Sequence, residues 1–279
     1  MRAPLPPLLV ALALIVTALV TSQPMIVGAA FVGALLLHHA APPPRRLMLR
    51  VALASGLLIA VLNPFVAVEG DHVLIAGPHF LLLDLEVTSE ELLYGVVAGL
   101  RLATAILATS AFLRLADPDR TQALASRVVP RSALTVALAA RLAPTLRRDA
   151  TGLHEALRLR GSGPGRGRRA AIRQGAVLIE PLVASSLERG VDISEAMVAR
   201  GYGGGTMTRL PEPPYTGAER TGLGAGLVGC LLGAALAVGL APYAIYPVAD
   251  PLITPVAVGT ALAVLLLSAI GAGALRARP

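Results

Sequence analysis

Lysine is absent from this chain, and several other ordinary components are scarce. The composition counts 24 lysine and arginine residues together, and the sequence shows that all of them are arginine. A P-loop ATPase needs the lysine of its phosphate-binding motif, so we do not expect the chain to hydrolyse ATP by that mechanism. Cysteine occurs once, at Cys230, which excludes an intramolecular disulfide framework and a cysteine-based metal cluster. Charged residues make up only 15% of the chain, too few for a typical soluble domain.

Apolar residues are correspondingly abundant, and they are gathered in long runs. Hydrophobic residues make up 55% of the chain, and the mean hydropathy is +0.70. A membrane-spanning helix needs about 20 predominantly apolar residues. Six candidate segments lie at about 5–22, 24–41, 47–63, 91–115, 222–243 and 253–275. The sequence therefore predicts an all-α integral membrane protein with about six membrane helices, of which the first two form a tight hairpin that is tilted or partly re-entrant.

The arginines predict which ends of these segments face the cytoplasm. They are concentrated between the second and third segments, at the C-terminus, and between residues 114 and 220, and basic residues favour the cytoplasmic side. Acidic residues instead gather between the third and fourth segments, and no arginine occurs from Val51 to Leu100. Six crossings with both termini in the cytoplasm place every arginine-rich loop on the cytoplasmic side and the acidic loop on the opposite side. We therefore expect a multi-pass protein of the cell membrane.

This topology divides the chain into three parts. Residues 1–116 hold the first four membrane segments, residues 117–220 form a large cytoplasmic region, and residues 221–279 hold the last two segments. In the cytoplasmic region, apolar residues recur at helical spacing and arginines punctuate them, which predicts amphipathic helices.

Three such helices are expected in the cytoplasmic region. The first ends near Arg160, and Pro144 should kink or break it, because proline lacks the backbone donor and clashes with the preceding turn. The second and third are expected at about 170–189 and 192–200.

A seven-residue phrase occurs twice in this region. EALRLRG, residues 155–161, returns as EAMVARG, residues 195–201, 40 positions later. Each copy places an Ala and an Arg four residues apart, hence on one helical face, and a Gly follows directly. Glycine there readily takes the left-handed conformation that ends a helix, and an arginine in the last turn suits the negative end of the helix dipole.

Each copy thus presents a guanidinium at a helix tip. A single copy could be an ordinary helix end, but two copies in one cytoplasmic region favour docking into acidic grooves of a partner, because a guanidinium can pair with a carboxylate through two hydrogen bonds. The candidate site residues are Glu155, Ala156, Arg160, Gly161, Glu195, Ala196, Ala199, Arg200 and Gly201.

Further stretches carry a family resemblance. They are NPF at 63–65, ELLYGVVAGLRLA at 91–103, RLAP at 141–144, EPL at 180–182 and the two Arg-Gly phrases. With them the chain resembles the transmembrane T component of energy-coupling factor (ECF) transporters, which are ABC-type importers for vitamins and trace metal ions. The signature of that family is a pair of Ala-Arg-Gly motifs on cytoplasmic coupling helices. Ala199, Arg200 and Gly201 match it fully, whereas the first copy has Leu159 in place of alanine.

The resemblance implies a non-catalytic scaffold. Its expected partners are two ATP-binding ABC ATPase subunits, a membrane-embedded substrate-binding S component and the lipid bilayer. ATP and Mg would be held by the ATPases, so we expect no cofactor bound directly to this chain. In this family the motif arginines contact grooves in the ATPases, and closure of the ATPases is thought to reorient the S component. Arg160 and Arg200 are then the two points of coupling.

Other residues are candidates for contact with a partner. Arg101 lies about ten residues into the fourth apolar segment, where a charge is costly and usually faces protein. It could face a partner or pair inside the subunit. Arg141 and Pro144 of the RLAP stretch are further candidates. Four glycines, Gly222, Gly226, Gly229 and Gly233, give small-residue faces that favour internal helix packing over contact with the S component.

Three other classes of protein share some of these features. A conventional ABC permease shares the Glu, Ala and Gly of EALRLRG, but it needs no second Arg-Gly phrase, and it is the alternative retained. A membrane-embedded metalloenzyme could use the outer acidic and histidine residues, but no ligand spacing such as HExxH occurs. A pI of 10.6 could indicate nucleic-acid binding. Arginines beside anionic lipid explain that charge better, so no nucleic-acid partner is expected.

Overall fold

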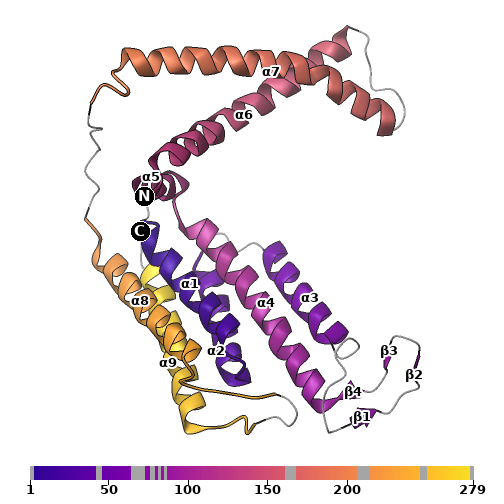
Figure 1. Cartoon of the computed structure of the whole chain (residues 1–279), viewed down its shortest axis with the longest axis vertical. Coiled ribbons are helices and arrows are strands. Elements are labelled where there is room, and N and C mark those ends of the chain that lie inside the picture. Colours follow the sequence, from indigo (N-terminus) through magenta and orange to yellow (C-terminus); the bar gives the residue numbers. More distant parts are fainter. Residues whose placement is uncertain are drawn as a thin grey trace. The chain divides into compact units, whose positions relative to one another are not determined.

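The chain is predominantly helical and separates into two compact units, whose elements are labelled in Figure 1. The first unit, called the helix bundle here, comprises Met1–Thr121 and Pro214–Pro279. The second, called the arginine-rich unit, comprises Gln122–Pro213. The computed structural model describes residues 3–41, 46–63, 73–75, 79–80, 83–84, 87–160, 168–205, 214–245 and 250–276.

The helices of the bundle coincide with the apolar segments of the sequence. They are α1 (Leu5–Val20), α2 (Pro24–Ala40), α3 (Arg46–Leu62), α4 (Ser89–Leu115), α8 (Gly217–Ala237) and α9 (Pro255–Arg276). Each of the predicted segments overlaps one of these helices, and the ends differ by a few residues, most in α8, which begins and ends earlier than predicted. The helical fold predicted from the sequence is therefore confirmed.

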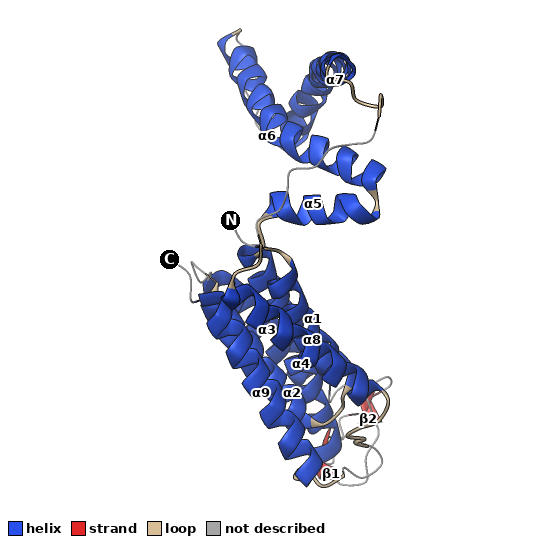
Figure 2. Cartoon of the chain, turned by 90° about the vertical axis from the view of Figure 1, so that its left-hand side faces the viewer, coloured by secondary structure: helices blue, strands red, loops and turns tan. Residues whose placement is uncertain are grey.

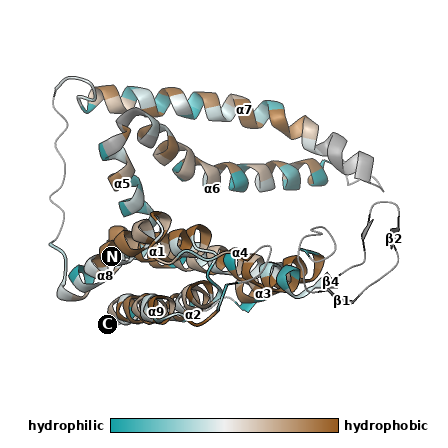
Figure 3. Cartoon of the chain, turned by 60° about the horizontal axis from the view of Figure 1, so that its bottom comes forward, coloured by the Kyte–Doolittle hydropathy of each residue, from teal (hydrophilic) through white to brown (hydrophobic). Residues whose placement is uncertain are grey.

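Three of these helices are long and apolar enough to cross a membrane. Among the described residues these are α4, α8 and α9, whereas α1 and α2 are shorter apolar helices of 16 and 17 residues. Figure 3 shows the apolar character of the bundle helices, which contrasts with the mixed hydropathy of α6 and α7. The chain is a membrane protein, as expected.

Small residues bring the bundle helices close together. Gly222, Gly226, Gly229 and Gly233 of α8 all face α1. A methyl group on Gly226 would lie 2.6 Å from the Leu9 Cβ, and one on Gly229 would lie 2.9 Å from the Ala13 Cβ. These glycines therefore let two helices of the same chain approach each other, which confirms the prediction of internal packing.

The contact between α3 and α4 is also made by glycines. A Cβ on Gly56 would lie 2.8 Å from the backbone carbonyl oxygen of Gly99, and a Cβ on Gly99 would clash with the carbonyl oxygen of Gly56. Most other residues of α3 are exposed, and only Ala52 and Gly56 are buried. The position of α3 thus depends mainly on its packing against α4.

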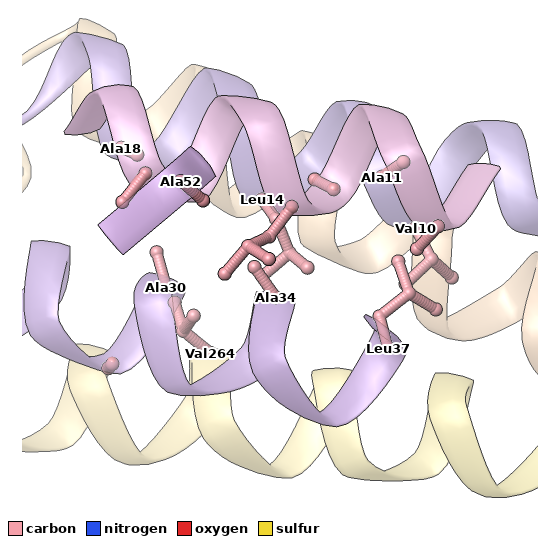
Figure 4. Close-up of a cluster of buried hydrophobic side chains, with 14 of the residues drawn as sticks. Val10, Ala11, Leu14, Ala18, Ala30, Ala34, Leu37, Ala52 and Val264 are labelled. Atoms are coloured by element: carbon pink, nitrogen blue, oxygen red, sulfur yellow. The ribbon is translucent and has the colours of Figure 1, made fainter. Parts of the chain in front are cut away.

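The core of the bundle is made of small aliphatic side chains. Figure 4 shows part of it, where α1 contributes Val10, Ala11, Leu14 and Ala18 and α2 contributes Ala30, Ala34 and Leu37. Ala52 of α3 and Val264 of α9 complete the labelled cluster. Alanine predominates because wide side chains would push the helices apart.

Four short strands lie between α3 and α4, where the sequence predicted only a loop. They are β1 (Val73–Ile75), β2 (His79–Phe80), β3 (Leu83–Asp84) and β4 (Val87–Thr88), drawn red in Figure 2. Strand β1 pairs antiparallel with β4, and β2 pairs antiparallel with β3. His79 and Asp84 are opposite each other in the second pair. Among the described residues no group of three or more potential metal ligands comes together.

The arginine-rich unit departs from the predicted helix boundaries. It contains α6 (Pro130–Leu159) and α7 (Arg168–Ala199), and an unpredicted helix, α5 (Pro118–Val128), precedes them. The sequence predicted two helices, at about 170–189 and 192–200, where the structure has the single helix α7. The prediction of two helices was wrong because the helix continues through Gly190. A glycine inside a helix costs about 1 kcal/mol, whereas a break leaves several backbone groups without partners.

Proline also fails to end either of these helices. Pro144 lies inside α6 and Pro181 lies inside α7. Of the kink or break predicted at Pro144, the break does not occur. Both prolines are exposed, and an exposed carbonyl that loses its helical partner can be satisfied by water.

Substituting Gly99 by Ala should weaken the packing of α3 on α4. The added methyl group meets backbone rather than a flexible side chain, so we expect a loss of about 1–3 kcal/mol and a lower midpoint of thermal unfolding in detergent. Gly28→Ala is the matched control, because a methyl group there meets nothing within 4 Å. Equal stability of the two variants would contradict this account of the contact.

Candidate functional site

The helix end at Arg200 is a Schellman turn. The backbone N–H of Gly201 donates to the Val198 carbonyl at 2.9 Å, and that of Tyr202 donates to the Met197 carbonyl at 2.9 Å. Gly201 has φ of 80°, the left-handed conformation predicted from the sequence. Helix α7 ends at Ala199 and Arg200 follows as its cap, so the backbone changes direction directly after the arginine.

The helix end at Arg160 begins in the same way. Arg160 is the C-cap residue of α6, and its N–H donates to the Ala156 carbonyl at 3.1 Å. In α7 the N–H of Arg200 donates to the Ala196 carbonyl at 3.2 Å. The predicted turn at Gly161 lies outside the described residues. Up to the arginine, the two copies of the phrase have the same hydrogen-bonding pattern.

Both copies of the phrase are largely exposed, and only Leu157 and Met197, at equivalent positions, are half-buried. The exposed candidate residues are Glu155, Ala156, Leu159, Arg160, Glu195, Ala196, Ala199, Arg200 and Gly201. Leu159 has a relative exposure of 90%, which is high for a leucine. In the part of the chain that the structure describes, neither motif guanidinium has a side-chain partner. Exposed arginines beside small or apolar side chains form a surface suited to contact with an acidic partner.

The other predicted contact residues lie in two places. Arg141 and Pro144 are exposed on α6, on the part preceding the first phrase. Arg101 lies in α4 and is half-buried, and its Nη2 donates to the Thr21 carbonyl at 2.8 Å and to the Ser22 hydroxyl at 3.2 Å. These partners favour the internal role that the sequence left open for Arg101.

A match to a protein family shows how the chain is related to known proteins. Residues 4–210 match the family described as CbiQ, cobalt transport protein. The chain belongs to the CbiQ family. No curated protein matches the chain.

The CbiQ match covers α1 to α7 and contains both Arg-Gly phrases, whereas α8 and α9 lie beyond it. The resemblance noted from the sequence is thereby confirmed at the level of the family. The match also includes α6 and α7 in full, so the exposed arginine ends are a part of the CbiQ-like region rather than an addition to it.

Some polar contacts in this CbiQ-family chain were not predicted. Arg114, in the last turn of α4, donates to the carbonyl oxygens of Ala41 at 3.0 Å and His38 at 3.1 Å, at the end of α2. Its Nη2 also lies 2.7 Å from Nδ1 of His38, which is 1% exposed. Arg114 therefore ties the ends of α2 and α4 together. The partners at the end of α2 are more than 70 residues away in the sequence, and no local pattern predicts them.

Gly201→Ala should loosen the end of α7. An L-residue in the left-handed conformation costs about 1–2 kcal/mol, so we expect the amides of residues 198–202 to exchange hydrogen for deuterium several-fold faster. Mass spectrometry of the exchanged peptides measures this directly. Gly205→Ala is the control, because Gly205 does not have a positive φ. Unchanged exchange in Gly201→Ala would mean that the turn does not depend on glycine.

Arg101→Ala should destabilise the bundle, because it removes the donor to the Thr21 carbonyl and the Ser22 hydroxyl. Losing a partner of a buried polar group costs about 1–3 kcal/mol, and thermal unfolding in detergent should report it. Arg50→Ala is the control, since Arg50 is exposed on α3. An internal role for Arg101 would be refuted if the two variants unfolded at the same temperature.

Proposed function

We propose that this chain is the transmembrane T component of an ECF-type transporter. In this role it is a scaffold that transmits motion from two cytoplasmic ABC ATPases to a membrane-embedded S component. The observation that carries the proposal is the pair of exposed arginine helix ends, 40 residues apart, within the region that matches the CbiQ family. The family description makes a cobalt ion the first transported substrate to test.

The two helix ends are suited to binding a pair of similar subunits at the same time. Arg160 and Arg200 stand at the same place in their phrases, and each is exposed at the end of a long helix, of 30 residues in α6 and 32 in α7. A helix transmits a push along its axis because its backbone hydrogen bonds resist compression. A guanidinium that forms two hydrogen bonds with a carboxylate adds orientation to that contact.

The chain must take its energy from other subunits under this proposal. Because it contains no lysine, a P-loop of the usual kind cannot form in it, and ATP and Mg belong to the ATPases. The chain itself is then a transporter subunit and not an enzyme. The ATPases would lie on the cytoplasmic side, where both Arg-Gly phrases are expected.

The proposed topology has six crossings. Helix α1 has 16 residues, which is about 24 Å at 1.5 Å per residue, and the hydrocarbon core is about 30 Å thick. Short helices of this kind are accommodated by local thinning of the bilayer. Six crossings place both termini and the arginine-rich unit together in the cytoplasm, in agreement with the distribution of arginine.

Changing Arg160→Glu and Arg200→Glu together tests this function. Each change replaces a positive group by a negative one, so acidic grooves on the ATPases should repel both helix ends. We expect the double variant, purified by a tag on this chain, to lose the ATPases and to stop ATP-dependent uptake of cobalt ions into cells.

The control is the double variant Arg147→Glu and Arg148→Glu. Both residues are exposed on α6, and the change in net charge is the same, but neither belongs to an Arg-Gly phrase. It should retain the ATPases and uptake. Retention by the Arg160→Glu and Arg200→Glu variant as well would refute the proposal. Recovery of the unmodified chain with a soluble binding protein and a second permease would instead favour a conventional ABC importer.

A further inference from the structure

The similarity between α6 and α7 extends well beyond the seven-residue phrases. Half-buried positions of α6 occur at Leu142, Thr145, Leu146, Asp149 and Leu153. The residues 40 positions later in α7 are all half-buried too. The residues between them, at 147–148 and 151–152, are exposed, and so are their counterparts at 187–188 and 191–192. The two helices therefore use similar faces over about 20 residues that end at Arg160 and Arg200, apart from Ala150 and His154, which are half-buried where their counterparts are exposed.

Equivalent positions also meet where the two helices contact each other. Nη2 of Arg189 donates to Oδ2 of Asp149 at 3.0 Å, and 189 is again 40 positions after 149. Figure 1 shows α6 and α7 crossing. Two copies of a repeat that meet at the same internal position are related by an approximate two-fold axis through that point. The ion pair lies next to this axis.

The charges at this position differ between the copies for a physical reason. Two identical charged side chains at the two-fold position would place like charges together, which is unfavourable. With Asp149 in one copy and Arg189 in the other, the contact becomes attractive. Nη1 of Arg189 is buried and has no hydrogen-bond partner among the described residues. The bond from Nη2 to Asp149 is therefore the contact that holds this guanidinium at the crossing.

The same number of residues separates the ion pair from each motif arginine along its helix. Arg160 follows Asp149 by 11 positions, and Arg200 follows Arg189 by 11 positions. At 1.5 Å per residue, each arm extends about 16 Å from the pair. A slip of one residue in either helix would rotate its face by about 100° and lengthen one arm relative to the other. The register of α6 against α7 thus decides whether the two guanidiniums are placed alike.

We propose that Asp149 and Arg189 are a positioning pair, which fixes the register of α6 against α7 and thereby holds Arg160 and Arg200 at equal distances from the crossing. Equal arms let both arginines engage a two-fold pair of ATPase subunits at the same time. The role of equal arms in ATPase binding rests on the proposed function. The effect of the ion pair on the distance between the arms can be measured without any ATPase.

The test combines charge reversal with a distance measurement on the full-length chain. Nitroxide labels are placed at Arg158→Cys and Val198→Cys, which are equivalent exposed positions, in a background with Cys230→Ser. Double electron–electron resonance then gives the distance distribution between the arms in detergent. Asp149→Arg and Arg189→Asp, each made alone, should broaden and shift this distribution. The double variant, which exchanges the two charges, should restore it.

Function should follow the same pattern. We expect each single reversal to lower ATPase co-purification and cobalt uptake roughly fivefold, the upper range for a partly exposed ion pair, and the exchanged pair to recover both. Arg148→Glu and Glu188→Arg are the controls, because these residues are also displaced by 40 positions and opposite in charge, but both are exposed. They should change neither the distances nor uptake.

The outcomes separate the two proposals. An unchanged distance distribution in the single reversals, or no recovery in the exchanged pair, overturns the positioning role even if the Arg160→Glu and Arg200→Glu variant loses the ATPases. Equal effects of the control variants overturn it as well. A third outcome is that the distances depend on the charges at 149 and 189, but that the Arg160→Glu and Arg200→Glu variant still binds the ATPases. This result would confirm the positioning role of the ion pair and refute the proposed function.

Discussion

The close approach of helix backbones in the bundle is the constraint on which the rest of the structure depends. Between helices surrounded by lipid, burial of apolar surface gives little drive for association, because the lipid tails are as apolar as the side chains. Association then depends on van der Waals contact and therefore on small residues at the interface. The glycines of α8 against α1, and Gly56 against Gly99, provide that contact. The core follows the same rule, with alanine as its most frequent residue.

Polar groups complete the bundle where close packing ends. Thr88 and Thr216 each form a capping box with a glutamate three residues later, so α4 and α8 begin with satisfied backbone donors. Arg101 binds the turn between α1 and α2, and Gln23 of the same turn donates to the Leu252 carbonyl at 2.9 Å. These contacts connect chain segments that small-residue packing alone would leave unattached, and they fix the ends of the helices.

The arginine-rich unit differs from the bundle in how little of its surface is buried. Its helices bury few side chains, and many apolar residues of α6 and α7 are exposed, among them Val136, Val177, Leu187 and Val198. Isolated soluble helices of this kind would be poorly stabilised, because tertiary packing supplies most helical stability. Exposed apolar surface of this extent is typical of a surface that binds another protein or a membrane. The exposed apolar faces of α6 and α7 are therefore suited to contact with a partner or a membrane.

Sequence patterns predict these two units to different extents. Hydropathy locates the bundle helices because each has a long apolar run, and the motifs TSEE and TGAE mark the starts of α4 and α8. The partners of Arg101 and Arg114 are not predictable, since they are brought together only by packing of distant helices. Asp149 and Arg189 are an intermediate case. Extending the 40-residue displacement from the two phrases to the residues before them would have revealed opposite charges at equivalent positions.

The repeat is most informative where its two copies differ. Identical residues at Glu155 and Glu195, and at Arg160 and Arg200, suit two similar binding grooves. Two like charges would repel each other at the crossing, whereas Asp149 and Arg189 attract each other there. Leu159 opposite Ala199 has no such cause, because both are exposed at the tips. Under the proposed coupling function, we expect this difference to match a difference in what the two tips contact, in grooves that are similar in charge but not in shape.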